Sequence, residues 1–251
     1  GFHGVGALVY NGTGFVGMIH SYPSATVYTS PDGIAWSMLT GVDPGPGTDL
    51  AWSPELSLYV MVGEQGFIAT SPDAYSWTTV NDVNDPSPVT TVHLSGIRSL
   101  GGTLFAVGEY GTILTSSDGS AWTEVNYDDT TLWLSDIASN GETGVSANYV
   151  AVGPGAAFTS PDGVTWTRQA GAPGGNNNRI VWGGAPADCF VTVGMDNHLF
   201  TSPDGVTWTR RFLSDSPVYG QANLNDVSWN GSLFVVTSDG GTILTSTDGT
   251  E

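Results

Sequence analysis

The sequence predicts an all-β protein, a six-bladed β-propeller of four-stranded antiparallel blades, and three observations support this prediction. A Ser-x-Asp turn motif recurs at intervals of 41 to 45 residues, which is typical of propeller blades. Each interval holds three short apolar runs before the motif and a fourth run, rich in Val, Thr and aromatic residues, after it. No segment keeps the i, i+3, i+4 apolar spacing of a helix, because Gly, Pro or a polar cluster interrupts it first.

The turn motif has two identical copies, TSPDGVTWTR at residues 159–168 and 201–210, and weaker copies begin at Thr29, Thr70, Thr115 and Thr245. Its aspartate carboxylate can accept backbone N–H bonds as in an Asx turn, and the following glycine permits a positive φ. Its tryptophan supplies apolar area that packs one blade on the next. These structural residues are Asp32, Asp73, Asp118, Asp162, Asp204 and Asp248, with Trp36, Trp77, Trp122, Trp166 and Trp208. Ala74 replaces the glycine in the second copy, which predicts a different turn type there.

The motif spacing divides the chain into one propeller domain, with blades near residues 1–42, 43–83, 84–127, 128–171, 172–214 and 215–251. The last blade is expected to lack its outer strand, because the sequence stops before the next tryptophan. We expect a processed chain or a fragment, part of a larger chain or assembly. A right-handed β-helix is the alternative fold, but it predicts a shorter repeat without an Asp-Gly turn at fixed phase.

The run Ser-Pro-Asp-Gly-Val-Thr-Trp resembles the Asp-box, or bacterial neuraminidase, repeat, whose family form is Ser-x-Asp-x-Gly-x-Thr-Trp. The resemblance covers the whole chain, although here glycine follows aspartate directly and the motif is one residue shorter. It implies a sialidase-like propeller. Asp-box repeats occur in sialidases, xyloglucan hydrolases, sorting receptors, photosystem assembly factors and phage tail proteins, so the resemblance alone selects no chemistry.

The composition argues against several classes of partner. The formal net charge is -19, with five arginines, no lysine and a pI near 4.1, so nucleic acid and anionic membrane surfaces would be repelled. No run approaches 18 continuous apolar residues, so membrane insertion is not expected. A polar content carried by Thr, Ser, Asn and Gly favours an extracellular, cell-surface or virion setting.

The first strands of the blades are expected to line a central channel. Catalysis there would depend on which charged residues lie near this channel. A sialidase resembling that family would need three arginines there, and only Arg98 and Arg179 are candidates. A secreted glycoside hydrolase with two carboxylates at the channel mouth is the enzymatic alternative. Its candidate acids recur at equivalent blade positions, which favours structural roles, and they are Asp49, Asp136, Asp226, Glu64, Glu109, Asp196 and Asp239. We therefore expect no enzyme activity.

Metal and thiol chemistry have little support in the sequence. His3, His20, His93 and His198 lie far apart, without zinc-ligand spacing. Acidic pairs such as Asp128 and Asp129 have no calcium-loop pattern around them, so we predict no cofactor and no metal, although calcium stays open. Cys189 is the single cysteine, and its apolar neighbours suggest a buried small hydrophobe.

Binding is the favoured function. The longest loops link the outer strand of one blade to the inner strand of the next, and aromatic rings beside Asn and Asp suit neutral sugars. The candidate ligand-binding residues are Tyr127, Trp133, Asn177, Arg179, Tyr219 and Asp226. The sequence thus predicts a non-catalytic extracellular or virion-surface module, for adhesion or receptor attachment through a glycan or protein partner on the long-loop face. A protein-protein assembly scaffold is a further alternative.

Overall fold

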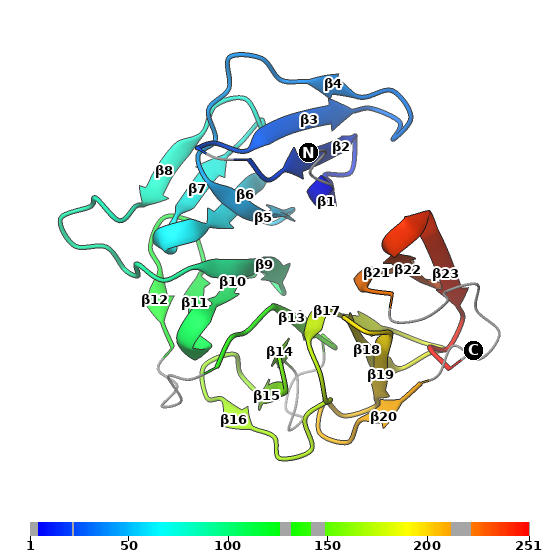
Figure 1. The fold of residues 1–251 in the computed structure, drawn as a ribbon. Coiled ribbons are helices and arrows are strands. Elements are labelled where there is room, and N and C mark those ends of the chain that lie inside the picture. Colours follow the sequence, from blue (N-terminus) through cyan, green and yellow to red (C-terminus); the bar gives the residue numbers. More distant parts are fainter. Residues whose placement is uncertain (1–4, 22, 126–131, 142–148, 212–221, 251) are drawn as a thin grey trace. The chain divides into compact units, whose positions relative to one another are not determined.

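The computed structural model describes residues 5–21, 23–125, 132–141, 149–211 and 222–250, and in them the chain forms six antiparallel sheets (Figure 1). This confirms the predicted fold class, an all-β six-bladed propeller. It also confirms that the last blade has three strands where the others have four. The chain divides into two compact units, Gly1–Asp128 and Asp129–Glu251, with three blades in each.

The first unit holds blades one to three, and in each sheet the strands follow one another in sequence order. Within this unit β5 contacts both β1 and β9, so the first strands of the blades are neighbours. The strands are β1 (Val5–Tyr10), β2 (Phe15–Ile19), β3 (Thr26–Ser30) and β4 (Ser37–Met38); β5 (Gly47–Ser53), β6 (Leu58–Gly63), β7 (Ile68–Ser71) and β8 (Thr78–Asn81); and β9 (Leu94–Leu100), β10 (Thr103–Gly108), β11 (Ile113–Ser116) and β12 (Thr123–Glu124).

The second unit repeats this arrangement in blades four to six, with β17 in contact with β13 and β21. Its strands are β13 (Asp136–Ser139), β14 (Tyr149–Gly153), β15 (Ala156–Ser160) and β16 (Thr167–Arg168); β17 (Asn177–Gly183), β18 (Cys189–Gly194), β19 (His198–Ser202) and β20 (Thr209–Arg210); and β21 (Leu224–Trp229), β22 (Phe234–Ser238) and β23 (Thr242–Ser246).

The outer strands are shorter than the sequence suggests. The predicted run from Val206 onward contains only the two-residue strand β20, because the residues before it belong to the aspartate turn. Strand β8 is the exception, with four residues where β4, β12, β16 and β20 have two. Helical structure in the described ranges is confined to three 3-10 turns, η1 (Glu64–Gly66), η2 (Glu109–Gly111) and η3 (Asp239–Gly241). None of the described helices has the length and apolar character needed to span a bilayer.

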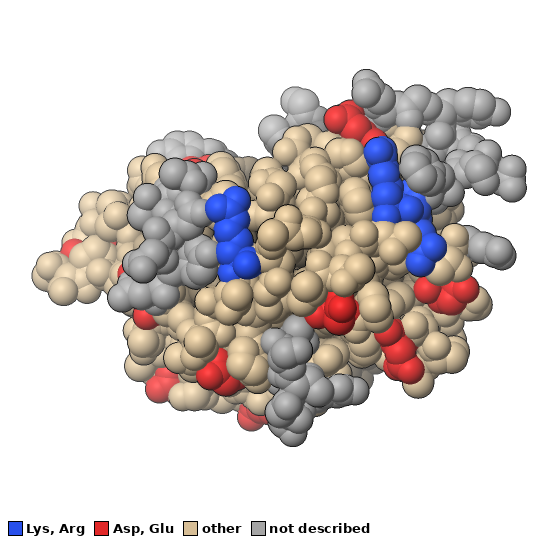
Figure 2. Space-filling model, turned by 90° about the horizontal axis from the view of Figure 1, so that it is seen from below, with Lys and Arg blue, Asp and Glu red and all other residues tan. Residues whose placement is uncertain are grey.

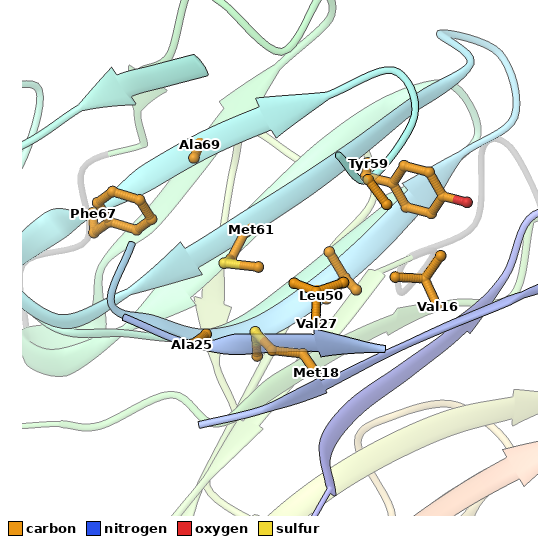
Figure 3. Close-up of a cluster of buried hydrophobic side chains, with 10 residues drawn as sticks. Val16, Met18, Ala25, Val27, Leu50, Tyr59, Met61, Phe67 and Ala69 are labelled. Carbon is orange, nitrogen blue, oxygen red and sulfur yellow. The ribbon is translucent and has the colours of Figure 1, made fainter. Parts of the chain in front are cut away.

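Apolar cores form between neighbouring blades within each unit. Figure 3 shows the core between blades one and two, where Met18 and Val27 of blade one face Leu50 and Met61 of blade two. All four side chains are at most 2% exposed. Alternate residues of blade two point the other way, and they form a second core with blade three. A central blade is therefore buried on both faces, and its strands are almost continuously apolar.

The turn tryptophans occupy the margins of these cores, as predicted, but to different extents. Trp77, Trp122 and Trp208 pack against the core between their own blade and the blade before it. Trp36 is 40% exposed and Trp166 only 9% exposed. Each indole N–H donates to the backbone carbonyl three residues earlier, at 2.9–3.2 Å, so the polar end of the ring is satisfied locally.

The aspartate turns contain the hydrogen bonds expected of the motif. In every copy one carboxylate oxygen accepts the backbone N–H two residues later, and in the five longer copies it also accepts the N–H three residues later, at 2.7–3.0 Å. The serine before it donates its hydroxyl to the same oxygen. Because these bonds stabilise the ionised carboxylate, they lower the pKa of Asp32, Asp73, Asp118 and Asp162, for Asp118 to about 2 through the N–H groups of Ala121 and Ser120.

The prediction of a different turn in blade two is wrong. Ala74 adopts the left-handed conformation of the glycines it replaces, with φ of 65°, and Asp73 accepts the same two backbone N–H groups. A side chain in this region costs about 1 kcal/mol. The Ala74 methyl group is 1% exposed and packs in the core between blades one and two, and this burial offsets the strain.

Candidate functional site

The first strands of blades two and three are joined by a buried aspartate. Asp49, on β5, accepts the backbone N–H of Ile97 at 3.0 Å and the guanidinium of Arg98 at 3.1 Å, both from β9. Its side chain is only 3% exposed. The carboxylate therefore connects two blades and neutralises one of the five arginines, a structural task for one of the acids considered for hydrolysis.

The second unit repeats this connection between blades four and five. Asp136, on β13, accepts the backbone N–H of Ile180 at 3.1 Å, and Asp136 is fully buried. The aspartate on the first strand of blade six is in a different environment. Asp226 lies 3.8 Å from the Nε of Arg179, and its side chain is 60% exposed. Arg179 and Asp226 are thus two predicted ligand-binding residues that the fold brings together, as an ion pair at the surface of the second unit.

Several loops of the first unit carry acids and histidines. Glu64 and Glu109 begin η1 and η2, and His20 lies 3.8 Å from Glu64. Burial lowers the pKa of His93, and the negative charge of Glu109 partly opposes this effect. No group of three or more His, Cys, Asp or Glu in the described part of the chain has the geometry to hold a metal ion.

A groove of about 400 Å³ lies between blade two and blade three, and it is a candidate site for a ligand. This volume falls within the range of about 300 to 1,000 Å³ that is usual for small-ligand sites. One wall is the indole of Trp122 beside Ser120, from the aspartate turn of blade three. The opposite wall comes from β8 and the following loop, and its lining residues are Val80, Asn81, Asp85, Pro86, Ser87 and Val89.

Asn81 holds this opposite wall in place. Its amide donates to the carbonyl oxygens of Gly66 at 2.7 Å and Thr90 at 2.9 Å, while its oxygen accepts the N–H of Val89 at 2.7 Å. The side chain is 3% exposed, so these bonds are protected from water. They fix the base of the loop from residue 82 to residue 93, and the middle of this loop lines the groove together with Trp122.

The middle of the loop is braced by its own hydrogen bonds. Asp82 and Asp85 form two hydrogen bonds with each other. The Asp82 N–H donates to the Asp85 carboxylate at 2.8 Å, and the Asp85 N–H donates to the Asp82 carbonyl at 3.0 Å. Asn84 donates its backbone N–H to the Asp82 carboxylate at 2.7 Å. The exposed groups at the groove, Asp85 and Ser87, therefore stand on a loop with a defined conformation.

The residues predicted for ligand binding do not gather in this groove. Asn177 is fully buried and donates to the carbonyls of Pro173 and Gly153, so it braces a loop of the second unit. Trp133 is 43% exposed. Tyr127 and Tyr219 lie outside the described residues. Sequence reasoning missed the groove residues, although the length of the loop after Asn81 and its cluster of Asp, Asn, Pro and Ser were the available signal.

Cys189 fits the role predicted for it. The thiol is buried, its sulfur lies 3.6 Å from the Asp248 carbonyl oxygen, and burial raises its pKa. A thiol that is harder to ionise is a weaker nucleophile.

The surface charge agrees with the composition. On the face drawn in Figure 2, acidic side chains stand apart from one another among uncharged residues, and arginines are few. Such a surface repels polyanions while leaving uncharged areas open to neutral ligands.

These features define a β-propeller protein with a surface groove at a junction between blades. No family model matches the sequence, and no curated protein matches it. Solved structures are similar in fold. The chain is 16% identical to YCF48 bound to D1 peptide, with a TM-score of 0.63, covering 97% of this chain and 76% of that one.

Two further structures have a TM-score of 0.68. One is the WD40 repeats of RRP9, 11% identical, with 96% of this chain and 75% of that chain covered. The other is catalytically inactive virginiamycin B lyase from Staphylococcus aureus with quinupristin, 12% identical, with 96% and 83% covered. At such low identity the likeness establishes the propeller fold and nothing finer.

Proposed function

We propose that the chain is a non-catalytic binding module and that the groove between blades two and three takes a neutral glycan. The observation that carries this proposal is the composition of the groove wall: an indole face with the carboxylate of Asp85 and the hydroxyls of Ser87 and Ser120 around it. Sugar C–H groups stack on aromatic rings, and sugar hydroxyls bond to carboxylates and hydroxyls. The net charge of -19 favours uncharged over anionic sugars.

Binding without catalysis is supported by how the acids are used. Two-carboxylate hydrolysis needs a pair of acids across the substrate. Of the described groove residues Asp85 alone carries a carboxylate, and Asp49 and Asp136 bond to the backbone of the next blade. A glycoside hydrolase therefore has less support than a binding module.

The finer assignments are part of the same proposal. We assign the turns to the Asp-box class on the resemblance of their sequence and on the repeated Ser–Asp hydrogen bond at 3.0–3.2 Å. We place the protein outside the cell or on a virion, in adhesion or receptor attachment. A peptide or protein partner is the second candidate, because one of the similar propellers is bound to a peptide.

The test is a glycan array with the purified chain at physiological salt, run once with calcium and once with a chelator. Specific binding to uncharged glycans is expected in both conditions, since Asp85 is the only carboxylate among the described groove residues. Binding only with calcium would point to a metal-mediated site instead, and silence across the array would favour a protein partner.

Two substitutions then locate the site. Trp122→Ala removes the stacking face, and Ser87→Arg fills the mouth of the groove from an exposed position without touching the core. Both are expected to weaken glycan binding at least about tenfold, as loss of an aromatic anchor does. Trp208→Ala is the matched control, because Trp208 has the same place and the same N–H bond in blade five. Equal binding by Trp122→Ala and the unmodified chain would overturn the proposal.

A further inference from the structure

The groove between blades two and three has apolar side chains in its depth and polar side chains at its mouth. Val80 and Val89 on the blade-two side and Trp122 on the blade-three side are packed against the core that the two blades share. The exposed lining residues form the mouth, and they are Asp85, Pro86, Ser87 and Ser120. A ligand in the groove therefore meets apolar surface from both blades and polar groups around its edge.

The polar atoms in the depth of the groove are already bonded within the protein. The Trp122 indole N–H donates to the carbonyl of Gly119 at 3.2 Å. The Asn81 amide donates to two backbone carbonyls, and its oxygen accepts the N–H of Val89 at 2.7 Å. These two are the polar side chains below the mouth among the described groove residues. A ligand hydroxyl pressed against either wall would lose its bonds to water without gaining a partner, which weakens binding.

The groups at the mouth can accept hydrogen bonds from a ligand. The backbone N–H of Asp85 donates to the Asp82 carbonyl, and that of Ser120 donates to the Asp118 carboxylate. The side chains at the mouth are then the carboxylate of Asp85, which accepts only, and the hydroxyls of Ser87 and Ser120. This arrangement suits a ligand whose hydroxyls project from its edge.

A pyranose ring whose substituents are all equatorial matches this distribution of groups. Its hydroxyls project from the edge of the ring, and each of its two faces carries only C–H bonds. Glucose and xylose units in β-linked chains have this form. Mannose and galactose units each have an axial hydroxyl, which stands on one face of the ring. In the groove that hydroxyl would point at the valines of blade two or at the indole of Trp122.

We propose that the groove selects β-linked chains of glucose or xylose units over chains whose rings carry an axial hydroxyl. This selectivity rests on the glycan binding proposed above and assigns the class of sugar to the same site. The apolar walls supply the rejection, because they have contact surface for two C–H faces and no free polar group for a hydroxyl. Asp85 and the two serines supply the bonds to the equatorial hydroxyls.

The test compares three β-linked tetrasaccharides by isothermal titration calorimetry with the unmodified chain. Cellotetraose and xylotetraose should bind. Mannotetraose differs from cellotetraose in the orientation of one hydroxyl on each ring, and it should bind at least about tenfold more weakly because that hydroxyl is left unpaired. Equal binding of cellotetraose and mannotetraose would refute the selectivity and leave the glycan-binding function standing. Binding of none of the three would contradict both.

Two variants place the rejection at the walls. Val80→Thr and Val89→Thr each add a hydroxyl to the blade-two wall, and a ring can turn either face toward this wall. At least one variant should therefore bind mannotetraose more tightly and narrow the ratio of the two affinities. Val164→Thr, at an exposed position in the turn of blade four, is the matched control and should leave the ratio unchanged. An unchanged ratio in both wall variants would refute the walls as the source of the selectivity.

Discussion

The junction between blades two and three and the junction between blades four and five share their inner connection and differ in their outer loop. Asp49 and Asp136 each accept a backbone N–H from the first strand of the following blade, at 3.0 and 3.1 Å. Each junction also has a buried asparagine that donates to two backbone carbonyls of the neighbouring loops. These shared contacts hold the blades together, so the loops that connect the blades can differ in length and conformation.

The two asparagines show how the divergence arises. The Asn81 oxygen accepts the N–H of Val89, whereas the buried Asn177 oxygen has no hydrogen-bond partner in the described residues. The bond to Val89 closes a longer loop, from residue 82 to residue 93, and that loop forms the wall opposite Trp122. The bond from the Val89 N–H to the Asn81 oxygen thus accompanies the loop that lines the groove, and the Asn177 oxygen has no such bond in the described residues.

The largest expected effect is on the shared contact. Asp49→Ala removes the acceptor of the Ile97 N–H and leaves Arg98 without this carboxylate, and we expect a loss of roughly 3 kcal/mol in the free energy of unfolding. Urea unfolding followed by tryptophan fluorescence measures it. Asp49→Asn keeps one oxygen acceptor and should cost less. A loss below about 1 kcal/mol for Asp49→Ala would show that the aspartate does not join the blades.

The next effect sharpens the difference between the asparagines. Asn81→Ala leaves two carbonyls and one N–H without their partner and should cost roughly 2 to 3 kcal/mol. Asn177→Ala removes weaker bonds together with an unsatisfied oxygen and should cost about 1 kcal/mol. The same urea experiment compares them, and equal losses would contradict the distinction. Asn81→Ala should also weaken ligand binding in the groove, while Asn177→Ala should not.

A smaller effect depends on pH, through the turn that carries Trp122. The Asp118 pKa is about 2, below the ordinary aspartate value of 3.8, because the N–H groups of Ala121 and Ser120 bond to the ionised carboxylate. A lowered folded-state pKa stabilises the fold above about pH 4, and this contribution disappears as the pH falls toward about 2. The urea midpoint should fall over this window. Asp118→Asn should flatten the change, and an unchanged slope in that variant would exclude Asp118 as its source.

The smallest effect concerns Ala74, the alanine in a glycine position. Ala74→Gly relieves the strain of φ at 65° but removes a methyl group that is 1% exposed. The two contributions are each about 1 kcal/mol and of opposite sign, so the melting temperature should hardly change. A gain or loss well above 1 kcal/mol would show that one contribution dominates.

The propeller class was predictable because its signals are local. The carboxylates of Asp32 and its counterparts bond to residues two and three positions later, so a short motif specifies the turn, and its spacing counts the blades. The groove was not predictable in the same way. It depends on Asn81 reaching Gly66 and Thr90, fifteen and nine residues away, and on Trp122 of another blade. Ala74 was misjudged because propensity alone does not include the burial that offsets its strain.

An aspartate at one position of the first strand appears in every second blade, and this limits how the blades can be rearranged. Asp49, Asp136 and Asp226 hold one register position, which is occupied by Ala7, Gly96 and Arg179 in the blades between them. In a variant without blade three, blade two would directly precede blade four. The Asp49 carboxylate would then lie at the Ile137 N–H instead of the Ile97 N–H, and the Ile137 N–H already donates to Asp136 at 2.9 Å. Two buried carboxylates would then compete for one donor, at a large electrostatic cost. An engineer who lengthens or shortens this chain should therefore move blades as pairs.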